Sequence, residues 1–245
     1  MRVFGLIGFP LSHSISADYF NSKFRALGLM DCIYKLFPIE NIVELRNLLH
    51  SETALAGLNV TIPYKEKVIP FINELSSEAQ EIGAVNCINI RGGKLTGFNT
   101  DCFGFGKAYL KAIIETSSPV LILGNGGASK AVQFVLKKYG IDFLVVSRTK
   151  LYQTITYQDV TNEIIKNYKV IINTTSLGMF PDIKKLPPIN FMCISAQHIL
   201  IDMIYNPEST EFLKQGLLKG CMVFNGLSMF QLQAEKAWEI WNSTN

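Results

Sequence analysis

The stretch Val120-Leu121-Ile122-Leu123-Gly124-Asn125-Gly126-Gly127-Ala128-Ser129-Lys130 decides the fold of the second half of the chain. Its four apolar residues predict a buried strand, the glycines predict a tight turn, and the following residues to Tyr139 predict a helix. In that context Gly124 leaves the strand, and Gly126 lets the backbone approach a pyrophosphate at the helix N-terminus. Ser129 stands where the third glycine of such a turn is often found. The stretch therefore predicts a dinucleotide-binding turn.

The tip of the next predicted strand, Phe143 to Val146, indicates which dinucleotide is bound. It continues into Ser147-Arg148-Thr149-Lys150, and no acidic residue follows until Asp159. An NAD site usually places Asp or Glu at this tip to bind the ribose hydroxyls, whereas an arginine suits a 2′-phosphate. A solvated loop arginine is the ordinary alternative, but its position favours NADP over NAD.

Further apolar runs place this motif in a larger sheet. They are continuous rather than alternating, and helical segments separate them; they lie at Val170–Ile172, Ile199–Ile201 and Cys221–Phe224. Such runs indicate a parallel sheet covered on both faces. We therefore expect an α/β fold whose second part is a Rossmann-like, doubly wound domain over residues 102–224. The polar segment Glu115–Pro119 is typical of a linker.

The first part, residues 1–101, also alternates strand and helix patterns and predicts an α/β domain with a mainly parallel sheet. Expected strands are Val3–Ile7, Ile33–Phe37, Leu58–Ile62, and a hairpin of Cys87–Ile90 with Leu95–Gly97. Expected helices are one capped by Ser16 and closed by Gly28, Val43–Leu49, one from Ser76 or Ser77 to Ile82, and one starting near Thr100-Asp101. An amphipathic helix in 225–245 is expected to return to this first domain.

Composition excludes several classes of function. The chain has 245 residues, a net charge of +3 and 48% apolar residues, with no stripe of Lys and Arg for nucleic acid. No apolar run approaches the ~20 residues that span a bilayer. Five scattered cysteines without a CxxC pair indicate reduced thiols in the cytoplasm, and with only three histidines we expect no metal site.

Three polar clusters lie at the ends of predicted strands in the first domain. They are Gly8–Ser16, Asn59–Lys65, and Gly83–Asn86 together with Gly97–Asp101. The first offers hydroxyls beside a helix N-terminus, which can hold a carboxylate. The other two supply amides, a hydroxyl, an ammonium and an acid. Each also has an ordinary structural interpretation, with Ser16 as a helix cap, Asn86 as a turn residue and Asp101 as a helix-capping acid.

The order of these motifs along the whole chain resembles the shikimate dehydrogenase family. The motifs are G-x-P-x-x-H-S-x-S, N-V-T-I-P-x-K, G-A-V-N, G-x-N-T-D-x-x-G, G-N-G-G-A, S-R-T, N-T-T-S-L-G-M, D-M-I-Y-N-P and N-G-L-S-M ending in Gln233. The resemblance implies reversible reduction of 3-dehydroshikimate to shikimate by NADPH.

The resemblance also implies a role for each matching residue. On the substrate side, the catalytic pair would be Lys65 and Asp101. The substrate carboxylate would be held by Ser14 and Ser16, with Tyr205 nearby. The ring hydroxyls would be bound by Asn59, Thr61, Asn86, Asp101 and Gln233. On the cofactor side, Gly124, Gly126, Gly127 and Ala128 would form the turn, Arg148 and Thr149 the phosphate clamp, and Thr174, Met179 and Gly226 would complete the groove.

The chemistry of Lys65 and Asp101 supports those roles independently. Hydride transfer to a ketone leaves negative charge on its oxygen, which an ammonium can stabilise and then protonate. A lysine is a better acid than base near neutral pH. We therefore expect Lys65 to be the general acid in the reduction, oriented by Asp101.

Some positions depart from the family pattern. Ala17 replaces a usual proline, Ser147 a usual asparagine, and Tyr152 a frequent second basic residue for which Lys150 can substitute. The chain is also short for the family, and the proline-rich stretch 180–198 is interpreted as a shortened crossover.

Alternatives remain open: a quinate/shikimate dehydrogenase with relaxed cofactor use, or a non-catalytic NADP-binding regulatory module. As partners we expect the small-molecule substrate alone, with no nucleic acid and no membrane, and the protein as a monomer or homodimer.

Overall fold

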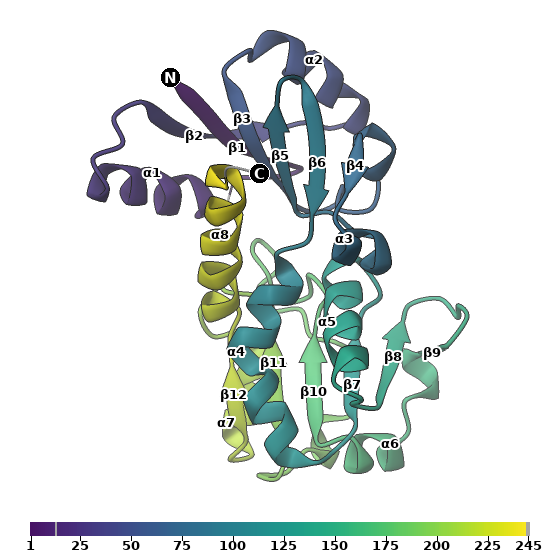
Figure 1. Ribbon diagram of the computed structural model, residues 1–245. Coiled ribbons are helices and arrows are strands. Elements are labelled where there is room, and N and C mark those ends of the chain that lie inside the picture. The colour runs from purple at the N-terminus through teal and green to yellow at the C-terminus, as the bar shows by residue number, and fades with distance from the viewer. Residues whose placement is uncertain (13, 244–245) are drawn as a thin grey trace. The chain divides into compact units, whose positions relative to one another are not determined.

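The computed structural model describes residues 1–12 and 14–243, and the chain divides into two compact units (Figure 1). Unit 1 comprises Met1–Thr100 with Glu235–Asn245, and unit 2 comprises Asp101–Ala234. His13 of the first polar cluster and the last two residues of the segment 225–245 lie outside the described residues. Within the described part of the chain, none of the helices combines the length and apolar character needed to cross a membrane.

Unit 1 is built on a six-stranded sheet with the order β2-β1-β3-β5-β6-β4. Its strands are β1 (Arg2–Gly8), β2 (Cys32–Pro38), β3 (Leu55–Val60), β4 (Glu74–Leu75), β5 (Cys87–Arg91) and β6 (Lys94–Phe98). Its helices are α1 (Ser16–Ala26), α2 (Leu45–Ser51) and α3 (Ser77–Ile82), with the short 3-10 helices η1 (Ile42–Glu44) and η2 (Ile69–Phe71). β1 pairs in parallel with β2 and β3, and β4 with β6, while β5 runs antiparallel to β3 and β6. The predicted, mainly parallel α/β sheet is confirmed.

Local chemistry explains how these elements begin and end. Gly92 and Gly93 join β5 to β6 with φ angles of 54° and 76°, a left-handed pair that a two-residue hairpin turn requires. The side chain of Ser76 accepts from Ala79 N at 3.2 Å to cap α3, which Gly83 closes in the left-handed region. The predicted hairpin and the cap of α3 are confirmed.

The first helix begins differently from the prediction. Ile15 occupies the N-cap position of α1 and Ser16 is its first helical residue, so the expectation that Ser16 caps the helix is wrong. Ser14 is the residue whose hydroxyl serves this helix end, because it accepts from Ser16 N at 3.3 Å. Gly28, with a φ of 68°, follows the end of the helix as predicted.

The C-terminal part of α8 (Leu227–Asn242) packs on the sheet of unit 1. Trp241 is stacked on Phe4, with ring centroids 4.9 Å apart, and its indole donates to Ile88 O at 3.0 Å. A Cβ on Gly57 would lie 2.3 Å from the Trp241 ring, so only glycine allows this approach. The prediction that the C-terminal helix returns to the first domain is confirmed.

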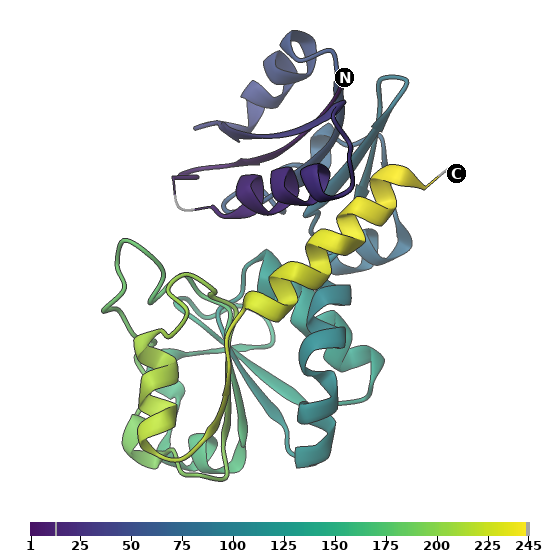
Figure 2. The ribbon, with the colours of Figure 1, turned by 90° about the vertical axis from the view of Figure 1, so that its left-hand side faces the viewer.

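Unit 2 is a six-stranded, fully parallel sheet with the order β12-β11-β10-β7-β8-β9. Its strands are β7 (Val120–Leu123), β8 (Phe143–Ser147), β9 (Thr154–Thr156), β10 (Val170–Asn173), β11 (Ile199–Asp202) and β12 (Met222–Phe224). Its helices are α4 (Asp101–Thr116), α5 (Gly127–Lys138), α6 (Asn162–Asn167), α7 (Glu211–Leu218) and the start of α8, with the 3-10 helices η3 (Tyr157–Asp159) and η4 (Phe191–Cys193). Figure 2 shows α7 on one side of this sheet and α4 with α5 on the other, which confirms the doubly wound fold.

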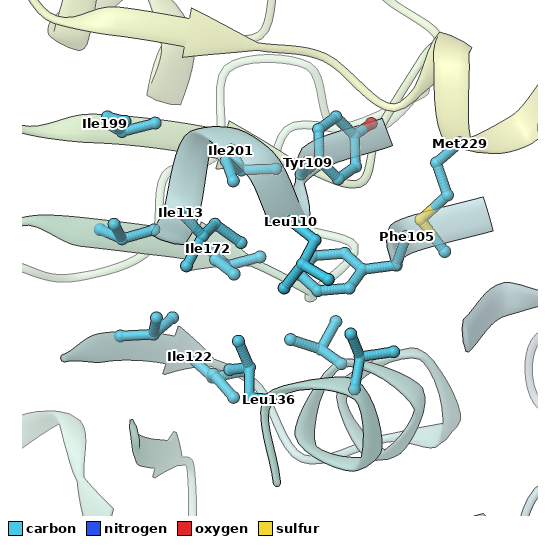
Figure 3. Packing of buried hydrophobic residues seen from close by; sticks show 14 of the residues in the cluster. Phe105, Tyr109, Leu110, Ile113, Ile122, Leu136, Ile172, Ile199, Ile201 and Met229 are labelled. Carbon is cyan, nitrogen blue, oxygen red and sulfur yellow. The ribbon is translucent and has the colours of Figure 1, made fainter. Parts of the chain in front are cut away.

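Alternate residues of the apolar strands feed two separate cores. On one face Ile122, Ile172 and Ile201 pack against α4, as Figure 3 shows from close by. On the other face Leu121, Leu200 and their neighbours pack against α6 and α7. Because both faces of this sheet are buried, its strands appear in the sequence as uninterrupted apolar runs.

Among the strands of the described residues, β4 and β9 were not predicted, and the helices α6 and α7 were expected only as helical segments without bounds between the apolar strands. All are eight residues or shorter, so each carries too few periods of its pattern to stand out in a sequence. The segment between β10 and β11 contains no α-helix, and its residues Leu186, Ile189 and Phe191 cover the sheet directly. The interpretation of 180–198 as a shortened crossover agrees with this arrangement.

Candidate functional site

Four polar motifs of unit 1 end at one edge of its sheet. β1 and β3 run in parallel and end at Gly8 and Val60, β5 begins at this edge because it is antiparallel, and β6 returns to it at Phe98. The residues that follow or precede these points are the ones that the sequence singled out. Parallel strand ends are the usual ligand-binding edge of an α/β sheet.

The loops after β1 and β3 are in close contact. A Cβ on Gly8 would lie 2.4 Å from Thr61 Cγ2, and Phe9 N donates to Ile62 O at 3.1 Å. Thr61 N in turn donates to Ile7 O at 2.9 Å. Since glycine at position 8 is required for this approach, the first motif and the Asn59–Lys65 motif are held together by the backbone.

Asn59 and Asn86 are both buried and form the inner part of this edge. Asn59 Oδ1 accepts from the Tyr34 hydroxyl at 2.8 Å, and its Nδ2 donates to Asn86 O at 3.3 Å. The Asn86 side chain accepts from Thr100 N at 2.6 Å and donates to Thr100 Oγ1 at 2.9 Å. Asn86 thus fixes the residue that directly precedes Asp101.

Lys65 reaches the same region through its backbone. Its carbonyl accepts from Val85 N at 2.7 Å, next to Asn86, and its side chain is half-buried. Contacts within unit 1 therefore link Lys65 through Val85-Asn86 to Thr100, the residue before Asp101. Asp101 is buried and begins α4.

The glycine-rich turn of unit 2 connects β7 to α5. Gly124 has a φ of 108°, and a Cβ there would lie 2.7 Å from Thr174 Oγ1. Gly126 is the N-cap of α5 and provides no side-chain cap, while a Cβ on it would meet no atom within 4 Å. The open space in front of this helix N-terminus suits a phosphate, because the first-turn N–H groups of a helix favour an anion.

The turn lies where the strand order of unit 2 reverses. β7 pairs with β8 on one side and with β10 on the other, and chain order runs outward from β7 in both directions. Ligands of doubly wound sheets bind at this point. Thr174 follows β10 and donates to Leu123 O at 2.7 Å, so it closes one side of the turn. Arg148 and Thr149 follow β8 on the other side and are exposed.

The remaining predicted residues of unit 2 follow β10, β11 and β12. Met179 is exposed in the loop after β10. Tyr205 follows β11 and packs on Phe230, with ring centroids 4.8 Å apart, and burial raises the pKa of its hydroxyl. Gly226 donates to Ile204 O at 2.9 Å, and a Cβ on it would lie 2.1 Å from Met203 O.

Gln233 lies beside the first turn of α4. A Cβ on Gly104 would lie 3.1 Å from Gln233 Cβ, and Gln233 Nε2 donates to Phe230 O at 3.0 Å. Gln233 thus packs against the first turn of α4, the helix that Asp101 begins. Among the described residues, no cluster of three or more His, Cys, Asp or Glu could hold a metal ion.

Comparison with known proteins places this fold and these motifs in one family. The family model "Shikimate dehydrogenase substrate binding domain" matches residues 6–88. Shikimate dehydrogenase (NADP(+)) of Clostridium beijerinckii is 40% identical over 251 residues, covering 98% of this chain and 92% of that protein. The enzyme of the same name from Carboxydothermus hydrogenoformans is 36% identical over 262 residues, covering 100% of this chain and 92% of its own. The chain belongs to the shikimate dehydrogenase family.

A solved structure of this family has the same architecture. Shikimate 5-dehydrogenase from Thermus thermophilus, in complex with NADP(H) and shikimate, matches with a TM-score of 0.87 and 30% identity. The match covers 99% of this chain and 94% of that one. The resemblance that the ordered motifs indicated is confirmed.

Sequence reasoning assigned no role to several residues that organise this shikimate dehydrogenase family member. Tyr34 and Thr100 bond the buried Asn59 and Asn86 of unit 1, while Asn173 and Asp202 form a buried pair in unit 2. Asn173 and Asp202 each end an apolar strand with a polar residue, and they face each other in the sheet register. A polar residue at the end of each of these two apolar strands was the sequence signal that could have identified the pair.

Proposed function

We propose that this chain catalyses the reversible reduction of 3-dehydroshikimate to shikimate with NADPH. The observation that carries the proposal is the convergence of four polar motifs at one edge of the unit 1 sheet, where glycine packing and the Asn86–Thr100 bonds hold them. Full-length likeness to enzymes named shikimate dehydrogenase (NADP(+)) supports the same reaction.

The cofactor proposed for unit 2 is NADP. Gly124 and Gly126 leave room for the pyrophosphate before α5, and Arg148, Thr149 and Lys150 are exposed at the end of β8 for a 2′-phosphate. Gly127 and Ala128 would present first-turn N–H groups to the pyrophosphate, and Thr174, Met179 and Gly226 would line the groove for the rest of the dinucleotide. When bound, the nicotinamide ring supplies the hydride in reduction and accepts it in oxidation.

The residues of unit 1 would bind the substrate. The hydroxyls of Ser14 and Ser16 lie at the start of α1, where donors and the helix N-terminus favour a carboxylate. Asn59 keeps one amide hydrogen beyond its bond to Asn86 O among the described contacts, and amides suit ring hydroxyls. Thr61 and Asn86 would bind hydroxyls from the same edge. From unit 2, Tyr205 and Gln233 are proposed to contact the carboxylate and a ring hydroxyl.

Lys65 is proposed as the general acid. Its ammonium would stabilise the negative charge that develops on the ketone oxygen during reduction and then donate a proton to it. Asp101, which follows the anchored Thr100, is proposed to orient Lys65 and to accept from the neighbouring substrate hydroxyl. In oxidation the same lysine would take the proton from the alcohol.

Initial rates of NADPH formation from shikimate and NADP⁺ test the proposal. We expect turnover with this pair, much weaker turnover with NAD⁺, and little with quinate. Absence of NADPH formation at millimolar shikimate and NADP⁺ would contradict the proposal, and equal rates with quinate and either cofactor would favour the broader quinate/shikimate activity.

We propose a cytoplasmic enzyme, because all five cysteines have free thiols and none pairs with another. We propose a monomer or a homodimer.

A further inference from the structure

A buried acid at the end of β11 organises the loops that follow β10 and β11. Asp202 is fully buried and is paired with the fully buried Asn173 in the sheet register. Its Oδ1 accepts from Asn173 Nδ2 at 3.1 Å and from Ile204 N at 3.0 Å, and its Oδ2 accepts from Thr210 Oγ1 at 2.6 Å. One carboxylate therefore joins three separate segments.

The hydrogen bonds of the Asn173 side chain determine the shape of the loop after β10. Asn173 Oδ1 accepts from Thr175 N at 3.1 Å and from Thr175 Oγ1 at 2.7 Å, and its Nδ2 also donates to Leu177 O at 3.3 Å. Thr175 Oγ1 accepts from Leu177 N at 3.1 Å. The loop is thus wrapped around the amide of Asn173. Thr174 and Thr175 of this loop both abut Gly124 of the glycine-rich turn, because a Cβ on Gly124 would lie 2.7 Å from Thr174 Oγ1 and 3.0 Å from Thr175 Cγ2.

The other two hydrogen bonds of Asp202, to Ile204 and Thr210, hold the turn after β11 and the start of α7. Ile204, whose N–H bonds Asp202, uses its carbonyl to accept from Gly226 N at 2.9 Å. Thr210 caps α7 by accepting from Leu213 N at 3.3 Å while it donates to Asp202. Met203 N donates to Asn173 O at 3.0 Å and ties the two strand ends together again.

Folding alone does not explain an acid at this place. Burial raises the pKa of Asp202 to about 6, so its three hydrogen bonds only partly offset the loss of water. Buried ionised groups are weak contributors to stability, and well-packed apolar residues often replace them without loss. What the carboxylate supplies is a set of fixed acceptors at the edge where strand ends bind ligands.

We propose that Asp202 is a positioning residue for the cofactor: through Asn173 it holds residues 174–177 against the glycine-rich turn and so sets the affinity for NADP⁺. The inference rests on the proposed dinucleotide binding. Loss of the carboxylate frees the loop, and the loop must then be ordered at the expense of binding energy.

The test is the dissociation constant for NADP⁺, measured by fluorescence titration of the purified full chain. Asp202→Ala is expected to weaken NADP⁺ binding about tenfold or more, because three donors lose their acceptor. Asp202→Asn keeps an oxygen for Asn173 and Ile204 and turns its amide to Thr210 Oγ1, so it is expected to stay within about threefold of the unmodified protein.

Thr175→Val tests the same network at a half-buried position. It keeps the shape of the side chain and removes its bonds to Asn173 and Leu177, and we expect roughly a threefold to tenfold weaker affinity for NADP⁺. Thr161→Val is the matched control, since Thr161 caps α6 at an exposed site by accepting from Ile164 N at 3.2 Å. It should lower the thermal midpoint and leave the NADP⁺ affinity unchanged.

The outcomes separate the two proposals. If the unmodified protein does not bind NADP⁺, the proposed function and this inference are both overturned. If the unmodified protein binds NADP⁺ and Thr175→Val binds it equally well, the inference alone is overturned, whether or not Asp202→Ala folds. Equal weakening by Asp202→Asn and Asp202→Ala would likewise overturn it, because the acceptor geometry would not be what matters.

Discussion

At the scale of single residues, Lys65 can be separated from a neighbouring lysine of the same turn. Lys67 is exposed two residues further on, whereas Lys65 is half-buried and bonded through its backbone to Val85. Lys65→Ala is expected to lower kcat by about 10²- to 10⁴-fold, the usual contribution of a general acid, with the NADP⁺ affinity unchanged. Steady-state kinetics with shikimate measure this loss.

Lys67→Ala is the matched control and should retain the kcat of the unmodified enzyme. Wild-type turnover by Lys65→Ala would remove Lys65 from the mechanism and leave the rest of the proposed site in place.

At the same scale, Arg148 is the residue proposed to set the preference for NADP⁺ over NAD⁺. Arg148→Ala is expected to raise the KM for NADP⁺ by roughly tenfold to a hundredfold, because a hydrogen bond to a charged group contributes about 1.5–3 kcal/mol. The KM for NAD⁺, which lacks the 2′-phosphate, should stay the same. Lys138→Ala removes an equally exposed cation at the opposite end of α5 and should alter neither constant. A parallel rise of both constants in Arg148→Ala would show that Arg148 does not read the phosphate.

At the scale of elements, Trp241 packs the end of α8 closely on the sheet of unit 1, in addition to the ion pair of Glu235 with Lys23. Trp241 is 4% exposed, lies against Gly57 and Phe4, and bonds Ile88 O, while Trp238 is only half-buried. Trp241→Ala is expected to cost about 3–5 kcal/mol of the free energy of unfolding, as large aromatic truncations in cores do. Urea denaturation gives this quantity.

Trp238→Ala is the comparison for this helix and should cost clearly less. If both variants lose the same free energy, general apolar cover by α8, and not the close approach at Gly57, holds the helix in place.

The elements also differ in how far their sequence predicts them. The hairpin at Gly92-Gly93 and helix α3 between Ser76 and Gly83 follow from local chemistry, because their turn and cap residues lie within a few positions of one another. The start of α1 does not. Ser16 has the side chain of a cap, but the bond between Ser14 Oγ and Ser16 N accompanies a helix start at Ser16 itself, with Ile15 in the cap position.

At the scale of the whole molecule, Asp202 makes stability depend on pH. Its pKa in the folded protein is raised to about 6 by burial, above the ordinary 3.8. The folded state therefore binds the proton more tightly, and the free energy of unfolding falls as pH rises from about 4 to 6 and is then constant for this group. At about 1.4 kcal/mol per pKa unit the loss is on the order of 3 kcal/mol.

Asp202→Asn removes this titration and leaves the other groups of the chain unchanged. We expect the free energy of unfolding of the unmodified protein, relative to that of Asp202→Asn, to fall by about 3 kcal/mol between pH 4 and 6. Tyr109, whose hydroxyl donates to Asn225 O at 2.7 Å, is the titratable neighbour of Asp202, and it stays protonated across this range because burial raises its pKa further. A pH-independent difference would mean that the carboxyl of Asp202 titrates normally.

The sequence by itself determined the α/β class, the strand–glycine–helix motif at Gly124 and the family, because these depend on local periodicity and on the order of short motifs. Only the tertiary structure decided which polar residues support those motifs. Asn173 and Asp202 are 29 positions apart and meet because β10 and β11 are neighbours in the sheet. Tyr34 and Asn59 are 25 positions apart and meet because β2 and β3 flank β1 in the same sheet. A buried hydrogen bond between residues far apart in the sequence leaves no local pattern, and only the arrangement of the strands in the sheet brings its partners together.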